Sequence, residues 1–272
     1  MSGTLFVCGL PIGNEKDISQ RAIEILNSVA KIAAEDTRSA ALLLKKWGVS
    51  KPLIAYHDHS GPAQKEKLLS LLKAGQDIAL ISEAGMPLIS DPGYQLIATA
   101  LRENITIRAV PGPTALTTAL VLSGQPSDKF CFEGFLSSRP SERKKRLSEL
   151  AEESRTLIFY EAPHRITETL QDILDIMGNR ACFLGRELTK KYEEHYRGAV
   201  AEVLQRIEQF PPRGELVLVL AGHKGPCRRQ EAADYAELIA ALRHKGLSDK
   251  DIIAVLSEGL RLNKNMLKKH VF

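Results

Sequence analysis

The sequence lacks several features that would assign it to a common class at once. It has four cysteines in 272 residues, at positions 8, 131, 182 and 227, so the close pairs of a structural zinc site are missing. No apolar run reaches the roughly 18 residues that a membrane helix needs. The strand-like stretch 4–8 begins without the basic region and cleavage site of a secretory signal. We therefore expect reduced thiols, no metal site and a cytoplasmic protein.

Two common nucleotide-binding motifs are also missing. The chain contains no G-x-x-x-x-G-K-[ST] phosphate loop, and the glycines after its first strand-like run do not follow the G-x-G-x-x-G spacing. Since each motif serves close backbone contact with phosphates, their absence argues against a P-loop nucleotidase and against a nicotinamide-dependent Rossmann enzyme.

The charge is unevenly placed along a chain of ordinary composition. Apolar residues make up 44% and charged residues 26%, which suits a globular protein with a real core. The net charge of +4 lies within residues 222–272, where ten Lys and Arg face six Asp and Glu. A neutral body with a basic tail indicates contact with a polyanion such as RNA, although a solvated surface would have the same composition.

Alternating strand and helix patterns predict an α/β fold. In the first half, apolar strand-like runs occupy residues 5–8, 29–34, 52–56, 78–81 and 105–110. Helical patterns lie between them at 40–47, 65–74, 93–101 and 114–123, and Ser19 is placed to cap a further helix. Short apolar strands alternating with helices are typical of a mostly parallel sheet covered on both faces.

A turn-rich seam at residues 123–127 predicts a domain boundary. We expect an α/β domain over 1–125, a second α/β domain over 126–222 and a basic helical tail over 223–272. The second domain has strand patterns at 130–135, 156–160, 181–185 and 215–221, and helical patterns at 141–153, 167–177 and 200–209. In the tail, Ser248 and Asp251 form a capping box, and Asn263 is placed to cap a last short helix. This tail is either a nucleic-acid-contacting module or a helical cap on the body.

Three Gly- and Pro-rich loops follow predicted strands of the first domain. They cover residues 9–14, 82–93 and 110–115. Ligands bind open α/β sheets at the carboxyl ends of strands, and Gly and Pro there allow tight turns and close backbone approach. Three such loops at one sheet edge predict a ligand cleft.

Seven ordered motifs resemble one family over nearly the whole chain. They are Pro-Ile-Gly-Asn at 11–14, Glu-Asp-Thr-Arg at 35–38, Ile-Ser-Asp-Pro-Gly-Tyr at 89–94, Pro-Gly-Pro at 111–113, Phe-Glu-Gly-Phe-Leu at 132–136, Phe-Tyr-Glu-x-x-His-Arg at 159–165 and Arg-Glu-Leu-Thr-Lys at 186–190. The pattern resembles the tetrapyrrole-methylase-like superfamily, and within it the ribosomal RNA small subunit methyltransferase I family.

The resemblance implies a fold, a cofactor and a substrate. It implies two α/β domains with S-adenosyl-L-methionine in the cleft between them, and a homodimer. It also implies 2'-O-methylation of a cytidine ribose in small-subunit (16S) ribosomal RNA, free or in the assembled 30S particle. Glu83 and Met86 stand where the family usually has Asp and Thr, and Leu10 where it usually has Thr.

The loops and motifs supply two sets of candidate site residues. Residues expected to line the cofactor pocket are Pro11, Gly13, Asn14, Glu83, Ala84, Gly85, Met86, Asp91, Pro111 and Gly112. Residues expected on the acceptor side, where they either serve catalysis and phosphate binding or form structural ion pairs, are Glu35, Asp36, Arg38, Glu161, His164, Arg165, Arg186, Glu187 and Lys190.

A ribose hydroxyl needs a group to take its proton. Lys190, with a pKa lowered by burial, is the first choice for this base, and Glu187 is the second. Two rival functions remain, a tetrapyrrole methyltransferase and a non-catalytic RNA-binding factor for ribosome assembly. A basic run at 139–146 is either an RNA contact or a solvated helix face.

Overall fold

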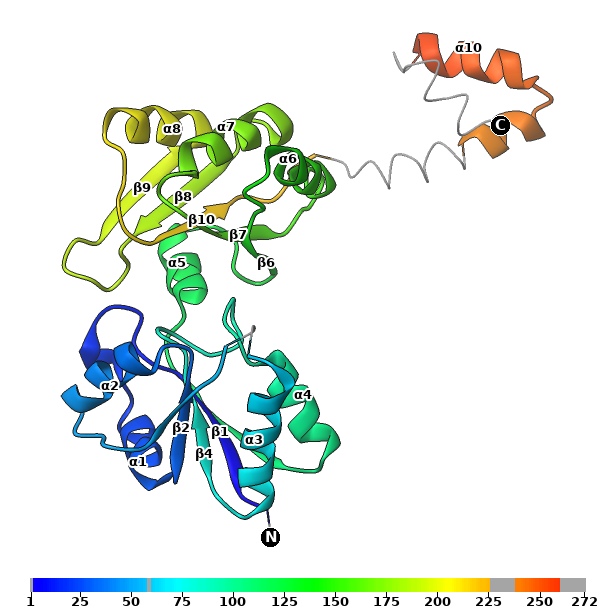
Figure 1. Ribbon diagram of the computed structural model, residues 1–272. Helices are drawn as coiled ribbons and strands as arrows, with labels where there is room; N and C mark the ends of the chain where they lie inside the picture. Colours follow the sequence, from blue (N-terminus) through cyan, green and yellow to red (C-terminus); the bar gives the residue numbers. More distant parts are fainter. Residues whose placement is uncertain (1, 58–59, 226–237, 260–272) are drawn as a thin grey trace.

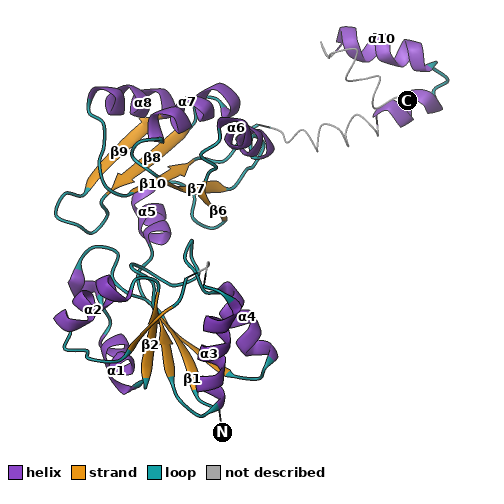
Figure 2. Cartoon of the chain, viewed as in Figure 1, coloured by secondary structure: helices purple, strands orange, loops and turns teal. Residues whose placement is uncertain are grey.

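The architecture consists of two five-stranded sheets, each with its own helices. The structure is a computed structural model that describes residues 2–57, 60–225 and 238–259. Figure 1 shows the two α/β domains one above the other, and Figure 2 shows helices on the faces of both sheets.

The first sheet is parallel throughout, as the sequence predicts. Its strands are β1 (Thr4–Cys8), β2 (Lys31–Ala34), β3 (Leu53–Ala55), β4 (Ile78–Leu80) and β5 (Thr106–Val110), in the order β3-β2-β4-β1-β5. The helices α1 (Gln20–Ser28) and α2 (Thr37–Lys46) lie on one face, and α3 (Pro62–Lys73) and α4 (Tyr94–Arg102) on the other (Figure 1). All three residues of β4 are buried, because both faces of the sheet are covered.

Local signals in the sequence explain the first elements. Ser19 caps α1, where its Oγ accepts a hydrogen bond of 3.1 Å from the backbone N–H of Ala22.

The thiols of Cys8 and Cys182 are buried and unpaired, and burial raises the pKa of each to about 12, so these thiols are inert.

The second sheet is mixed. Its strands are β6 (Phe130–Phe135), β7 (Thr156–Glu161), β8 (Ala181–Arg186), β9 (Glu194–Ala199) and β10 (Leu216–Leu220), in the order β6-β7-β10-β8-β9. Only the β6–β7 pair is parallel within it. The helices α6 (Pro140–Glu149), α7 (Ile166–Met177) and α8 (Val200–Gln209) enclose a large core on one face (Figure 2).

The helix α5 (Ala115–Ser123) belongs with the second sheet. Its Leu116 and Leu120 pack in one cluster with Phe183 of β8 and Val219 of β10, and Figure 1 shows the helix directly beneath that sheet. The predicted boundary after residue 125 therefore falls one helix too late. The turn signal at 123–127 marks the end of α5, whereas the chain crosses between domains at Pro111–Thr114.

The described part of the tail is helical. Residues 238–244 form one helix and α10 (Asp249–Gly259) another. One bond of the expected capping box is present, since the Asp251 N–H donates to Ser248 Oγ over 3.3 Å. Ile239, Ile252 and Leu256 form a small core between the two helices. The helix expected after Asn263 lies outside the described residues.

Among residues 2–57, 60–225 and 238–259, no helix has both the length and the apolar character to cross a bilayer.

Candidate functional site

The three Gly- and Pro-rich loops meet at one edge of the first sheet. They follow β1, β4 and β5, which are neighbours in the sheet, so their carboxyl ends lie side by side. Leu10 and Gly85 exchange backbone hydrogen bonds of 2.8 and 3.1 Å, and the Gly9 N–H donates to the Val110 carbonyl over 2.9 Å. The loops therefore form one connected backbone platform.

Gly9 shows how closely these loops approach one another. A Cβ atom at this position would lie 2.6 Å from the Met86 sulfur and 2.7 Å from the Gly112 Cα. Any other residue would push the loops apart, so glycine is required here. Met86, although it departs from the family pattern, packs against this junction.

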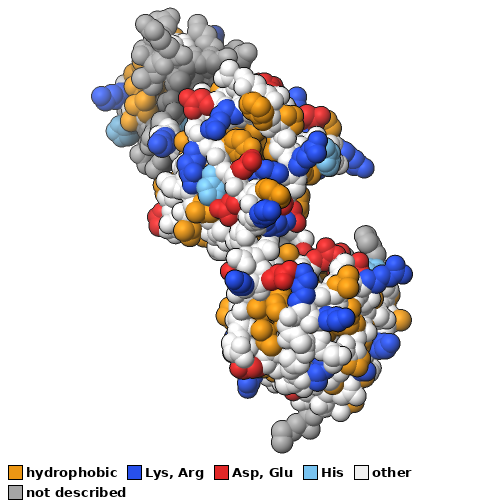
Figure 3. Space-filling view, turned by 90° about the vertical axis from the view of Figure 1, so that its left-hand side faces the viewer, with side chains coloured by type: hydrophobic (Ala, Val, Ile, Leu, Met, Phe, Trp, Pro, Cys, Tyr) orange, Lys and Arg blue, Asp and Glu red, His pale blue; other side chains and the backbone are white. Residues whose placement is uncertain are grey.

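A cavity of about 440 Å³ lies between this platform and the second domain. This volume falls within the roughly 300–1,000 Å³ of small-molecule sites. Figure 3 shows the two domains as two lobes that meet at a narrow waist, with acidic side chains on the upper rim of the lower lobe. The residues that line the cavity are Ile12, Glu83, Ala84, Gly85, Met86, Ile89, Ser90, Asp91, Thr114, Ala115, Phe135, Tyr160, Glu161, Ala162, Pro163, Gly214, Glu215, Leu216 and Val217.

Asp91 is the carboxyl group in this cavity with the most unusual electrostatics. Burial raises the pKa of Asp91 to about 6, and the negative charges of Glu35 and Glu83 add to the rise. A hydrogen bond with Ser82 acts in the opposite direction. A carboxyl group that titrates near neutrality can exchange a proton at physiological pH.

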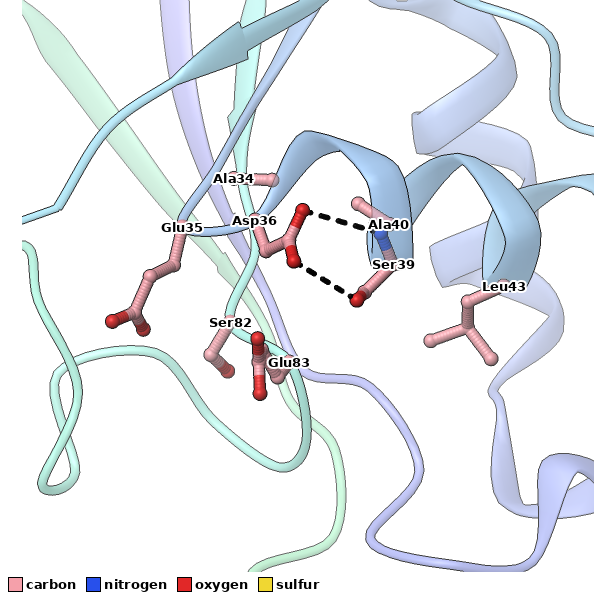
Figure 4. A pocket seen from close by; sticks show the side chains of 8 residues that line it. All are labelled: Ala34, Glu35, Asp36, Ser39, Ala40, Leu43, Ser82 and Glu83. Carbon is pink, nitrogen blue, oxygen red and sulfur yellow. Dashed lines mark hydrogen bonds between the residues drawn. The ribbon is translucent and has the colours of Figure 1, made fainter.

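A second, smaller cavity adjoins the first. It has a volume of about 210 Å³, and Glu83 lines both. Figure 4 shows that the Asp36 carboxylate is turned toward Ser39, while the Glu35 side chain points away from it. Asp36 caps α2 by accepting hydrogen bonds of 2.7 and 3.3 Å from the N–H groups of Arg38 and Ser39, which lower its pKa. Its role in the structure is helix capping, and Arg38 is exposed beside it.

Residues with strained backbone conformations lie in two loops at the contact between the domains. Five non-glycine residues of the described chain have positive φ, and four of them are Leu88 and Ser90 on one side and Glu187 and Thr189 on the other. Such conformations cost of order 1–3 kcal/mol each and concentrate at functional sites. Both stretches lie within motifs that the sequence marks as candidates.

Lys190 is placed differently from the prediction. Its ammonium lies 3.0 Å from Glu187 and 3.1 Å from Glu215. Burial alone would lower the pKa of Lys190, but the hydrogen bonds to these two carboxylates outweigh it and raise the pKa. Lys190 is therefore protonated and bridges the Glu187 and Glu215 carboxylates. The prediction that its pKa is lowered is wrong. Hydrogen bonds from the Glu215 backbone N–H and from the Lys190 ammonium hold the pKa of Glu187 below its ordinary value, despite burial, so Glu187 is a weak base.

Other predicted acceptor-side residues form structural pairs. Glu161 is buried, lies 2.7 Å from Arg165 and accepts a hydrogen bond of 2.7 Å from Thr169. Arg186 donates to the Arg213 carbonyl over 2.6 Å and pairs with Glu194 at 3.0 Å. His164 is exposed. Of these residues, only Glu161 also lines the main cavity.

The predicted cofactor residues divide into two groups. Glu83, Ala84, Gly85, Met86 and Asp91 line the main cavity. The others support the platform or its contact with the second domain: Pro11 is buried, Gly13 lies against Lys190, Asn14 donates to Thr189 over 3.1 Å, Gly112 packs on Gly9, and Pro111 is exposed beside it.

Several residues that line the cavity are not among the candidates predicted from the sequence. They are Thr114 in the connection between the domains and Phe135, Tyr160 and Glu215 in the second domain. Tyr160 accepts a hydrogen bond of 3.3 Å from the Leu116 N–H, and burial raises its pKa to about 12. Its place at the end of β7, opposite the loops, is the signal that could have found it.

All cations of the basic run at 139–146 except Lys145 are paired with carboxylates of the same domain. Arg143 is buried and pairs with Asp172 at 2.7 Å and Glu168 at 3.1 Å. Arg139 pairs with Glu142, Lys144 with Asp172, and Arg146 with Glu133 and Glu149. This pattern favours a structural and solvated helix face over an RNA contact.

Comparison with known proteins agrees with this architecture. The model of the family described as Tetrapyrrole (Corrin/Porphyrin) Methylases matches residues 4–204. The chain is 45% identical over 220 residues to a protein of Thermotoga maritima named ribosomal RNA small subunit methyltransferase I, covering 81% of this chain and 99% of that one. A relative of the same name from Escherichia coli O157:H7 is 43% identical over 271 residues, covering 98% and 94%. The chain belongs to the ribosomal RNA small subunit methyltransferase I family.

Solved structures place this family within a wider fold. The chain superimposes on diphthine synthase with a TM-score of 0.60 at 16% identity, covering 81% of this chain and 90% of that one. For cobalt precorrin-4 methyltransferase the TM-score is 0.59 at 14% identity, covering 80% and 94%. The predicted family, the two-domain tetrapyrrole methylase fold and the methyltransferase class are confirmed.

Proposed function

We propose that this protein transfers a methyl group from S-adenosyl-L-methionine to the 2'-hydroxyl of a cytidine in small-subunit (16S) ribosomal RNA. The observation that carries the proposal is the cavity between the two domains, in a chain whose relatives are named as ribosomal RNA methyltransferases over nearly its full length. The cavity combines a glycine-built platform with a carboxyl group that titrates near neutrality.

The lining residues fit such a cofactor. Met86, Ile12 and Ala84 offer apolar contacts, and Glu83 adds a negative charge suited to a sulfonium or ammonium group. The tight approach of Gly9 and Gly112 leaves backbone close to the space a ligand would occupy. When bound, the cofactor supplies an electrophilic methyl group on a positively charged sulfur.

The protein has to orient the acceptor and take up its proton. Positioning of the hydroxyl in line with the methyl–sulfur bond can supply roughly 7–11 kcal/mol. Since Lys190 is held in its protonated form, we assign the proton to Asp91, whose carboxylate lines the cavity. When the hydroxyl is methylated, its proton would pass to the Asp91 carboxylate and from there to solvent.

Two further parts of the proposal concern partners. RNA phosphates would meet the exposed Arg38 beside the smaller cavity and the basic tail. A homodimer is the expected assembly. Exposed apolar side chains on α4, Tyr94 at 70% and Leu101 at 59%, provide a surface for a second copy. The mass in solution, measured by light scattering, tests this expectation.

Methyl transfer to isolated small ribosomal subunits is the direct test. The purified protein is incubated with methyl-labelled S-adenosyl-L-methionine and subunits from cells that lack this enzyme, and the labelled nucleotide is mapped. We expect one labelled cytidine with the methyl group on the ribose. Label on a base would contradict the 2'-O assignment.

The wider fold family makes a tetrapyrrole methyltransferase the second candidate. Cobalt precorrin-4 methyltransferase shares the fold, and the same assay with uroporphyrinogen in place of subunits tests it. Transfer to the macrocycle would replace the RNA proposal. Calorimetric titration with the cofactor separates both enzymes from a non-catalytic RNA-binding factor, for which we expect no binding.

A further inference from the structure

The strand β6 contains an irregularity at the edge of the cavity. Its pairing with β7 shifts between Phe132 and Gly134, where Phe132 lies opposite Ile158 and Gly134 opposite Phe159. Glu133 is thus an extra residue, and Gly134 adopts a φ of +63°. A bulge of this kind bends a strand and turns the following side chain in a new direction.

The residue that the bulge turns is Phe135. Its relative exposure is 56%, unusually high for a phenylalanine at the end of a sheet strand. The ring lies 5.6 Å from that of Tyr160, at an interplanar angle of 64°. An edge-to-face contact with one neighbour holds the ring in place and leaves at least one of its faces clear of that neighbour.

Phe135 stands where the two domains approach each other. A Cβ atom on the adjacent Gly134 would lie 3.4 Å from Ser90 Oγ, in the strained loop of the first domain. Phe135 lines the same cavity as Asp91 and Ile89, and Ile89 is 36% exposed. Exposed apolar side chains from both domains therefore border the space that holds Asp91.

We propose that Phe135 is a stacking platform for a nucleobase of the RNA, which places the attached ribose in the cavity beside Asp91. The inference rests on the proposed function and adds a subsite to it. Sequence-specific recognition of RNA mostly targets unpaired bases, which stack on aromatic side chains. Tyr160 acts through Phe135 by fixing the angle of its ring.

A nucleobase could also reach Phe135 as the adenine of the cofactor. The position of the ring favours the RNA, because Phe135 belongs to the second domain, whereas the lining residues that we assign to the cofactor belong to the loops of the first. The two sources predict different losses of affinity, so a single variant distinguishes them.

The test is the Phe135→Ala variant with small ribosomal subunits as substrate and calorimetry for the cofactor. We expect the KM for subunits to rise about 5- to 150-fold, the range that one stacked base contributes. The Kd for S-adenosyl-L-methionine should stay within twofold, and Phe135→Trp should restore the KM. Phe130→Ala is the matched control, since Phe130 is 39% exposed at the opposite end of β6.

Three outcomes would overturn the inference. The first is that Phe135→Ala and Phe130→Ala change the KM for subunits equally. The second is that Phe135→Ala weakens cofactor binding while the KM for subunits stays unchanged, and the third is that Phe135→Trp does not restore the KM. If the unaltered protein transfers no methyl group, the proposed function fails by itself. Subunit binding measured by filter retention then tests the platform alone, and an unchanged Kd in Phe135→Ala contradicts it.

Discussion

Asp91 is the residue whose chemistry sets the expected pH dependence. Its carboxyl group has a pKa raised from 3.8 to about 6, so the fraction able to accept a proton grows as pH rises through that value. We expect kcat to rise about tenfold per pH unit below pH 6 and to level off above pH 7. A pH–rate profile with subunits as substrate measures this directly.

The Asp91→Asn variant separates proton transfer from cofactor binding. We expect kcat to fall by about 10²–10⁴-fold and the rise near pH 6 to disappear. If the main role of Asp91 is instead to bind the cofactor, the Kd for S-adenosyl-L-methionine will increase while the shape of the profile stays the same. That result would return the residue to the cofactor-binding role expected from its loop.

The raised pKa of Asp91 also affects stability, which falls with rising pH where kcat rises. Between about pH 4 and pH 6 the folded chain keeps a proton on Asp91 that the unfolded chain has released. The free energy of unfolding therefore decreases as pH rises through this window. In Asp91→Asn this contribution is absent, so the variant should lose less stability than the unaltered protein between pH 4 and pH 6.

The protonation state of Lys190 could not be predicted from the sequence. The motif at 186–190 marks a loop of the second domain that contacts the first, where the Asn14 N–H donates to Thr189 Oγ1. The partner that decides the protonation state of Lys190 is Glu215, which lies 25 positions along the chain and 3.1 Å away in space. Spacing could suggest Glu187 as a neighbour, but the second carboxylate depends on how β8 and β10 pair.

At the scale of elements, the cap of α1 is a local feature that sequence predicts well. We expect Ser19→Ala to destabilise the first domain by about 0.5–2 kcal/mol, because the Ala22 N–H loses its side-chain acceptor. The drop in melting temperature, measured by circular dichroism, checks this. Ser28→Ala at the other end of α1 is the control and should change the melting temperature little, since alanine favours helix there. Equal drops would show that the cap has no special role.

Elements with exposed or long-range partners escaped prediction. The strand β9 carries the sequence EHYRGA, has no fully buried residue and lies at the edge of its sheet, so no apolar run marked it. The buried strands β4 and β10 were found because each is an uninterrupted apolar stretch. The parallel first sheet was predictable from strand–helix alternation, whereas the antiparallel pairs of the second depend on contacts between distant segments.

At the scale of the whole molecule, α5 links the sheet edge to the second domain. The chain leaves β5, passes through the loop at Pro111–Thr114 and packs α5 against β8 and β10. Thr114 and Ala115 line the cavity on the way. The connection between domains is thus also part of the site wall, so a shift of one domain against the other would change the shape of the cavity.

The distribution of charge yields a last prediction. Four of the five cations in the basic run at 139–146 are paired with carboxylates, whereas the sequence concentrates the net charge of +4 after residue 221. Each Lys that contacts a phosphate adds about one to the slope of log affinity against log salt. We expect the triple change Lys264→Gln, Lys268→Gln and Lys269→Gln to lower that slope by up to about three and to weaken subunit binding without altering cofactor affinity.

The control is Lys144→Gln on α6, which removes one positive charge that is already paired within the domain. Its ammonium already lies 3.4 Å from Asp172, so the slope should stay unchanged. Titrations at several salt concentrations measure both variants under the same conditions. A tail variant that binds like the unaltered protein would identify the tail as a helical cap and would place the RNA-binding charge on the two domains. If only Lys144→Gln weakens subunit binding, the RNA-binding charge lies on α6, although Lys144 is paired with Asp172 there.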